Sequence, residues 1–326
     1  MTALLDASRP EATPVIRDVA AHGATVRVFE YELPPRESAS GAPVFLGVHG
    51  FRGDHHGFEQ IVLRTGGTWL VPDAPGFGAS TPMSDGTEHS AEGYASAYAK
   101  VLADTARRFP GRPVVLVGHS FGSVVVSRLL SPGARQDGAD DAGLAAVKAA
   151  VLVNPISVPA LEGTPRAATL AAEAYYAAAT RLPGWLGKPL VRSRLITDSM
   201  SVMMRTSTDR EMRRYIDEQH RAYFAGFASR DVLAEAYASS IRDSVRECAG
   251  AFTLPTLLVT GSRDAFGTPE TQARLAALMP QARVHEIAGV GHLIHYERAG
   301  EAAEAIAAFV REVVGESAGE TGRGSA

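Results

Sequence analysis

Cysteine is nearly absent from this sequence, whose 326 residues include a single one, Cys248. A single thiol excludes an internal disulfide, and it excludes metal sites built from several cysteines. The first residues include Asp6 and lack a sustained apolar stretch, so they do not resemble a secretory signal. We therefore expect a cytoplasmic protein, because a chain without disulfides suits a reducing compartment.

The sequence also lacks a long apolar run and an excess of one charge. No apolar segment approaches the about 20 residues that a membrane-spanning helix needs. Lysine and arginine number 32 against 36 aspartates and glutamates, which gives a formal net charge of −4. That balance offers no basic surface for nucleic acid or anionic lipid. We expect a small-molecule substrate as the partner, and a monomer or homodimer without a membrane span.

What the sequence does contain is a series of short apolar runs that alternate with amphipathic helical patterns. Runs rich in β-branched residues are typical of strands that are covered on both faces in a parallel sheet. They lie at residues 43–48, 68–71, 114–117, 147–153 and 255–260, and residues 282–287 form the last predicted strand. We predict an α/β fold with a mostly parallel sheet flanked by helices.

The predicted domain boundaries follow from the place where this alternation stops. Residues 14–155 and 250–314 form the α/β core, and residues 156–249, which carry only helical patterns, form an inserted helical cap. The cap interrupts the sheet, so we expect it to lie over the pocket as a lid. Residues 1–13 and 315–326 are small and polar, and we expect flexible termini there.

A Gly-x-Ser-x-Gly motif occupies residues 118–122, directly after the apolar run 114–117. Glycine on both sides of Ser120 permits a sharp turn from strand to helix, which lifts the serine Oγ clear of the backbone. The turn also directs the first amides of the helix at the atom that the serine attacks. The motif predicts Ser120 as a nucleophile, although an ordinary glycine-rich turn fits the same five residues.

A serine nucleophile requires a base, and the base requires an orienting acid. The carboxyl ends of parallel strands meet at one edge of a sheet, so the candidates for both groups are residues in the loops that follow predicted strands. Asp264 follows the run 255–260, and His292 follows the run 282–287. The sequence therefore predicts a catalytic triad in the order Ser120, Asp264, His292.

Both assignments have competitors. Asn154 ends the strand after the serine strand, where an acid could also serve, but an amide cannot fill that role. His295 lies three residues after His292, and His292 is favoured because it directly follows Gly-x-Gly. The neighbouring His55 and His56 suit metal chelation poorly, and we expect neither a metal nor an organic cofactor.

Acyl chemistry also needs hydrogen-bond donors for an oxyanion. The backbone amide of Phe121, directly after the serine, is one candidate. The amide of Phe51, in the glycine-punctuated loop 49–53, is the other. The side chains of Phe51 and Phe121 are candidates for the pocket wall, and core packing explains them equally well. His119, which we expect to point away from the serine, and Trp185 complete the candidate pocket.

Taken together, these motifs resemble the α/β-hydrolase superfamily, in its serine-nucleophile branch with a helical cap. The matching segments are His49-Gly50-Phe51, residues 73–80, 118–122 and 261–264, and Gly291-His292, in the family's order. The resemblance implies the triad Ser120, Asp264 and His292, an oxyanion hole from the Phe51 and Phe121 amides, and a structural role for Asp73. It also implies an esterase-like or lipase-like enzyme.

Several reactions share this serine. Epoxide hydrolases and haloalkane dehalogenases use aspartate at this position, so Ser120 argues against both. We expect hydrolysis of an ester of a small to medium, fairly apolar substrate through an acyl-enzyme. A carbon–carbon bond hydrolase with the same triad is one alternative, and a non-catalytic small-molecule receptor that retains the fold is another.

Overall fold

A mixed β-sheet forms the centre of the computed structural model, which describes residues 12–34, 42–132, 141–163, 174–176, 182–183, 187 and 191–321. The sheet has eight strands in the order β1-β2-β4-β3-β5-β6-β7-β8. Their bounds are β1 Val15–Ala21, β2 Ala24–Leu33, β3 Val44–Val48, β4 Gly67–Pro72, β5 Val114–His119, β6 Val147–Val153, β7 Thr256–Gly261 and β8 Ala282–Ile287. The pairs β1–β2 and β2–β4 are antiparallel and the remaining pairs are parallel, which confirms the predicted α/β fold.

Strand β1 was not predicted from the sequence. Most of its residues are exposed, including Val15 and Ile16, so it carries no buried apolar run. It pairs with β2 through a tight turn at His22 and Gly23, both of which have positive φ values. An edge strand of this kind is held by its ladder of hydrogen bonds rather than by a buried face, and its side chains give little signal.

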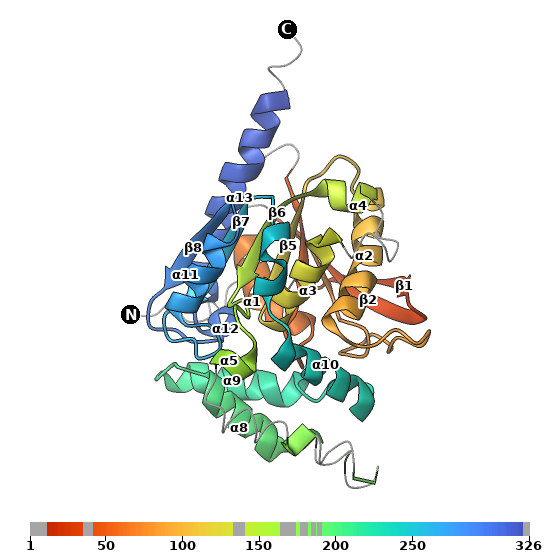
Figure 1. Cartoon of the computed structure of the whole chain (residues 1–326), viewed down its shortest axis with the longest axis vertical. Coiled ribbons are helices and arrows are strands. Elements are labelled where there is room, and N and C mark those ends of the chain that lie inside the picture. The colour runs from red at the N-terminus through yellow and green to blue at the C-terminus, as the bar shows by residue number, and fades with distance from the viewer. Residues whose placement is uncertain are drawn as a thin grey trace.

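Helices cover both faces of the sheet (Figure 1). The bounds of the helices that pack on the core are α1 Glu59–Thr65, α2 Ala91–Arg108, α3 Phe121–Leu130, α4 Asp141–Ala146, α11 Pro269–Ala277, α12 Ile294–Glu297 and α13 Ala299–Thr321, with the short 3-10 helix η1 His55–Phe58. Strand β5 directs Leu116 into the apolar cluster that includes α2 and α3, and Val115 into the cluster that includes α1 and α13. This alternation explains the near-continuous apolar runs.

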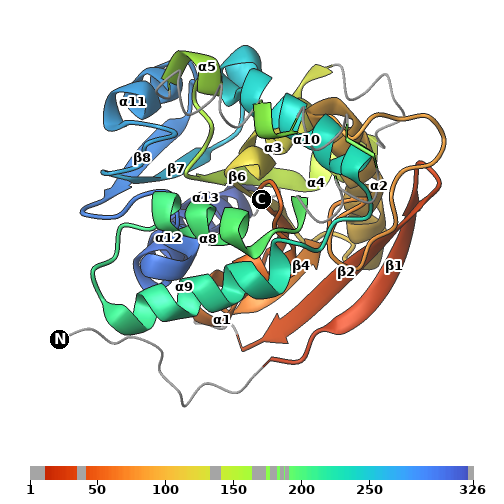
Figure 2. The ribbon, with the colours of Figure 1, turned by 90° about the horizontal axis from the view of Figure 1, so that it is seen from below.

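The described residues between β6 and β7 form α5 Ala160–Gly163, α8 Arg194–Met204, α9 Arg210–Tyr223, α10 Arg230–Arg242 and the 3-10 helix η3 Val245–Ala251. Helices α8, α9 and α10 lie at one end of the sheet, where α8 and α9 pack side by side and α10 lies apart from them beside α2 (Figures 1 and 2). The sequence shows helical patterns at residues 211–224 and 232–241, where α9 and α10 lie, whereas α8 was not predicted. We refer to α8, α9 and α10 as the cap helices.

A short backbone seam joins the cap to the core. The amide of Gly78 donates to the carbonyl of Gly226 at 2.7 Å, and the amide of Ala228 donates to the carbonyl of Gly76 at 2.8 Å. Phe77 and Phe227 form an antiparallel bridge between these two bonds. The loop after β4 therefore carries one attachment of the cap.

The last helix, α13, continues to Thr321, so residues 315–321, predicted to be part of a flexible tail, are helical. In Figure 1 this helix projects beyond the end of the sheet. Residues 1–11 and 322–326 lie outside the described part of the chain. None of the described helices is both long enough and apolar enough to cross a membrane.

Candidate active site

Ser120 occupies the sharp turn between β5 and α3. Its φ of 53° is in the left-handed region, which is costly for a residue with a side chain. The turn depends on glycine at both flanks because a Cβ on Gly122 would lie 2.0 Å from the Val48 carbonyl oxygen, and one on Gly118 would lie 2.7 Å from the Gly122 carbonyl oxygen. The flanking glycines are thus required by close packing around the strained serine.

The loops after β7 and β8 bring an acid and a base to this serine. The Ser120 hydroxyl lies 2.7 Å from Nε2 of His292, and Nδ1 of His292 lies 2.9 Å from Oδ2 of Asp264. Asp264 and His292 are both buried. The carboxylate can accept only from a protonated Nδ1, which leaves Nε2 as the acceptor for the serine proton. The structure therefore brings the three predicted residues into one hydrogen-bonded chain.

Asn154, the residue that was weighed against Asp264, lies between the acid and base loops. It is fully buried with a φ of 44°. Its Nδ2 donates to the carbonyl oxygens of Gly291 at 3.1 Å and His292 at 2.8 Å, while its Oδ1 accepts from the Gly261 amide at 2.9 Å. The sequence identified this position but not its use as a bridge.

The loop after β3 lies against the serine from the other side. A Cβ on Gly50 would come within 3.1 Å of the Ser120 Cβ, so only glycine allows this approach without displacement. The next residue in this loop is Phe51. Phe121 is the first residue of α3, and its amide belongs to the group that a helix leaves unpaired at its start. Both residues belong to segments that adjoin Ser120, and the role of their amides as oxyanion donors stays a prediction.

A cavity of about 690 Å³ opens above Ser120, between the carboxyl edge of the sheet and the cap helices. Its wall is mainly apolar and aromatic, and includes Phe51, Phe121, Tyr176, Met200, Tyr237 and Leu293. Phe121 also belongs to the buried core, and Phe51 packs against it, so both interpretations of these side chains hold. Trp185 lies outside the described residues.

His119 and His295 also line this cavity, beside the triad. Their ring centroids are 4.1 Å apart, and Nε2 of His119 lies 3.3 Å from the His292 carbonyl oxygen. Burial lowers the pKa of His119 to about 3 and the pKa of His295 well below its ordinary value. Both imidazoles are therefore neutral neighbours of the base, and the bond to Ser120 is made by His292.

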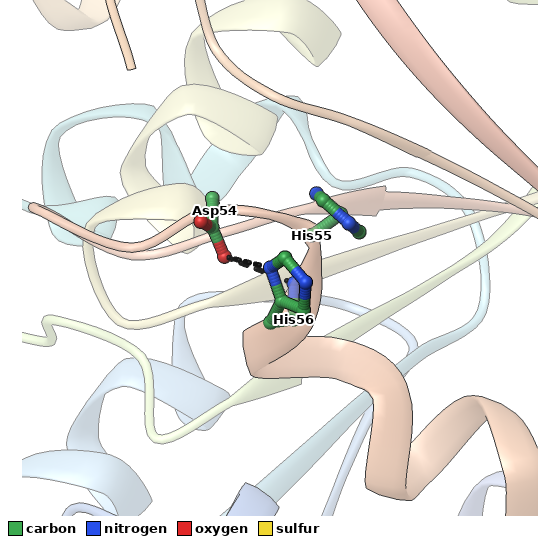
Figure 3. A group of neighbouring side chains, drawn as sticks. All are labelled: Asp54, His55 and His56. Atoms are coloured by element: carbon green, nitrogen blue, oxygen red, sulfur yellow. Dashed lines mark hydrogen bonds and ion pairs between the residues drawn. The ribbon is translucent and has the colours of Figure 1, made fainter. Parts of the chain in front are cut away.

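Asp54, His55 and His56 form a second cluster at η1 (Figure 3). Their potential ligand atoms lie within 4.8 Å of one another, close enough to surround a metal ion. Each imidazole already bonds a carboxylate, since His56 Nδ1 lies 3.0 Å from Asp54 and His55 Nδ1 lies 2.9 Å from Asp73. The two rings are tilted by 38° with their centroids 3.9 Å apart.

Asp73 is the acceptor that organises this region. It is fully buried and accepts hydrogen bonds from the His55 amide at 2.8 Å and the Ala79 amide at 2.7 Å. Burial raises its pKa, but the hydrogen bonds outweigh that effect and leave the pKa of Asp73 below its ordinary value. The contacts of Asp73 are with two loops and do not include Ser120 or His292.

Sequence reasoning missed Arg52, whose side chain is 1% exposed. A charged residue in a glycine-rich loop is typically solvated, and no local pattern indicates that it is buried. Tyr176 and Met200 of the cavity wall were missed as well, because the cap has no strand ends to align. The burial of such residues follows from the packing of the cap over the loop of Arg52, which the local sequence does not indicate.

Comparison with known proteins supports the fold and the family. The model of the alpha/beta hydrolase family matches residues 44–306. An esterase from Thermogutta terrifontis shares 22% identity, with a TM-score of 0.67 over 92% of this chain and 99% of that chain. A loop variant of haloalkane dehalogenase from Bradyrhizobium elkanii shares 18% identity, with a TM-score of 0.65 over 94% of this chain and 100% of that chain. Such identities establish a common fold and leave the reaction open.

One curated relative matches a short segment. Polyketide synthase ThaQ from Burkholderia thailandensis is 44% identical over 62 residues, which are 19% of this chain. The match spans 3% of the length of that protein. The family model covers most of the chain and the folds agree over its whole core, so this chain belongs to the alpha/beta hydrolase family.

Proposed function

We propose that the protein is a serine hydrolase that cleaves esters of small to medium, fairly apolar substrates through an acyl-enzyme on Ser120. The observation that carries this proposal is the hydrogen-bonded chain from Ser120 through His292 to Asp264. One structural neighbour is a haloalkane dehalogenase. Haloalkane dehalogenases use aspartate at the position of Ser120, so a serine there favours acyl chemistry over dehalogenation. The proposal needs no metal or organic cofactor.

The reaction follows from the geometry. His292 Nε2 accepts the Ser120 proton as Oγ attacks the ester carbonyl carbon, and the carbonyl oxygen gains negative charge beside the amides of Phe51 and Phe121. His292 then protonates the leaving alcohol, which departs as the acyl-enzyme forms. In the second half His292 takes a proton from water, whose oxygen attacks the acyl carbon. His292 then returns that proton to Ser120 Oγ as the bond between Oγ and the acyl carbon breaks and the acid leaves. Asp264 stabilises the imidazolium in both halves.

The cavity supports the proposed substrate class. A volume of about 690 Å³ lies within the range of pockets that hold drug-sized ligands. Its wall of aromatic and methionine side chains, including Phe51, Tyr237 and Met200, favours an apolar acyl or alcohol group. We further propose that this activity is cytoplasmic, because a chain with one cysteine gains nothing from an oxidising compartment.

Two measurements test the proposal. A fluorophosphonate probe should label the wild type and fail to label Ser120→Ala. The same variant should lose p-nitrophenyl ester hydrolysis, measured with acyl chains of graded length. Unchanged turnover by Ser120→Ala would refute the proposal. Preferred turnover of a vinylogous 1,5-diketone would replace it with carbon–carbon bond hydrolysis, and binding of a small molecule without any labelling would replace it with a receptor role.

A further inference from the structure

Arg52 follows Phe51 in the loop beside the serine, yet its side chain enters the cap. It is 1% exposed, and its backbone φ is 63°. Its Nε donates to the Phe224 carbonyl oxygen at 3.1 Å, its Nη2 to the Val191 carbonyl oxygen at 2.9 Å, and its Nη1 to the Tyr176 hydroxyl at 3.3 Å. All three acceptors come from the segment between β6 and β7. The guanidinium is thus bound to the cap and not to its own domain.

Within the described part of the chain, the guanidinium of Arg52 has no acidic partner. No carboxylate among the described residues forms an ion pair with it. A buried cation without a counter-ion is costly, and it must be compensated by dipoles. Phe224 caps the carboxyl end of α9, where the helix dipole is negative, and the Phe227 ring lies 5.6 Å from the guanidinium carbon. The cap supplies this compensation, so Arg52 is stable in its buried position only while the cap is seated.

The same residue closes the turn that contains the proposed oxyanion donor. The Gly53 amide donates to the Gly50 carbonyl oxygen at 3.0 Å, which encloses Phe51 and Arg52 in one tight turn. A left-handed φ is unfavourable for arginine, so the hydrogen bonds of its side chain must hold the turn in this form. The Phe51 amide lies within this turn, directly after Gly50, whose backbone packs closely against Ser120.

We propose that Arg52 is a positioning residue that couples the oxyanion hole to the seating of the cap. Its guanidinium anchors the turn of Gly50 to Gly53 on the cap and so holds the Phe51 amide where the oxyanion forms. Withdrawal of the cap removes the acceptors of Arg52, the turn relaxes, and the oxyanion loses one donor. This inference rests on the proposed hydrolase function, because it assigns a role within that reaction.

Arg192 provides a matched control. Its Nη2 donates to the Phe227 carbonyl oxygen at 3.2 Å, and its guanidinium lies over the same Phe227 ring at 5.3 Å. It therefore contributes to the same aromatic contact as Arg52. Its bond to Phe227 lies within the cap, so its loss weakens the cap without releasing the turn beside Ser120.

The experiment compares wild type with Arg52→Met, Arg52→Lys and Arg192→Met. It measures kcat and KM for a p-nitrophenyl ester, Kd for a trifluoromethyl ketone that mimics the oxyanion, and thermal unfolding. We expect Arg52→Met to lower kcat by about 10- to 100-fold, to weaken the ketone by a similar factor, and to change KM less than about threefold. Arg52→Lys should recover part of both losses, and Arg192→Met should leave kcat near the wild-type value.

Each outcome decides a separate question. A lower unfolding temperature with wild-type kcat and ketone affinity in Arg52→Met would reduce Arg52 to a packing residue and overturn the inference. If Arg52→Met does not fold, the same comparison of kcat, ketone affinity and stability in Arg52→Lys decides in its place. A wild type that fails to react with fluorophosphonate refutes the proposed function itself, and this role with it. A labelled wild type with unaffected Arg52 variants refutes only the role of Arg52.

Discussion

Asn154 binds the loop of His292 through its side-chain amide, which donates to the carbonyl oxygen of His292 at 2.8 Å. The oxygen of the same side-chain amide accepts a hydrogen bond from the backbone amide of Gly261, which ends β7 three residues before Asp264. One buried side chain therefore fixes the separation between the acid loop and the base loop. The role requires two donors and one acceptor, so an amide fits and a carboxylate does not.

Replacement of this amide by its isosteric acid tests the bridge. In Asn154→Asp the carboxylate faces the carbonyl oxygens of Gly291 and His292, and both donated bonds are lost. We expect the free energy of unfolding to fall by at least about 2 kcal/mol and kcat to fall with it. Urea unfolding measures the effect. Wild-type stability in this variant would contradict the bridging role.

Asp264 and Asp73 are both buried carboxylates with different partners. Asp264 bonds the imidazole of His292, whereas Asp73 accepts from the backbone amides of His55 and Ala79. Asp264→Asn should reduce kcat by about 10⁴-fold, because the amide no longer selects the productive tautomer of His292. Asp73→Asn should lower the unfolding temperature, because Asp73 supports the loops of His55 and Ala79. Its kcat, measured at 20 °C with the folded fraction known, should remain close to wild type. The reverse pattern would exchange the two roles.

The base is tested by two histidine variants. His292→Ala should lower kcat by about 10³-fold or more, because Ser120 loses its proton acceptor. His295→Ala should retain kcat within about tenfold, since its ring lines the cavity without a bond to Ser120. Steady-state kinetics with an activated ester distinguish the two. A larger loss in His295→Ala than in His292→Ala would identify His295 as the base.

The serine turn is predicted to tolerate no side chain at Gly122. A methyl group there would lie 2.0 Å from the Val48 carbonyl oxygen, which the neighbouring strand holds in place. We expect Gly122→Ala to lose more than about 3 kcal/mol of unfolding free energy or to fail to fold. Gly250→Ala is the control, because a Cβ at Gly250 meets nothing within 4 Å. Equal stability of the two variants would mean that the turn is less tightly packed than described.

Buried neutral histidines make stability depend on pH. Burial lowers the pKa of His119 and of His220 to about 3, against an ordinary value of 6.5. Between about pH 3 and pH 6.5 each of these histidines is protonated in the unfolded chain and neutral in the folded protein. The free energy of unfolding therefore rises with pH across this range, by about 1.4 kcal/mol per pH unit for each histidine. Urea unfolding from pH 4 to 7 should show a shallower slope for His220→Gln. The exposed His285→Gln should leave the slope unchanged.

Particular residues show what the sequence could and could not predict. Ser120, Asp264 and His292 could be predicted because each follows a predicted strand, and parallel strands bring such positions to one edge. Helix α8 was not predicted, because Thr197 and Ser201 are polar yet buried and disturb its apolar pattern. Arg52 was not predicted, because its burial depends on cap residues more than a hundred positions away. Local pattern determines strands and their ends, whereas contacts between the cap and the core depend on the whole fold.

The seam at Gly76 to Gly78 and Gly226 to Ala228 has an evolutionary consequence. Its two hydrogen bonds join backbone to backbone, so they are indifferent to the side chains that the cap carries. Helices α8 and α9 can therefore accumulate substitutions that reshape the cavity while this attachment persists. Mutations confined to the cap can therefore change which substrate is bound during evolution, while the residues at the catalytic edge of the sheet stay the same.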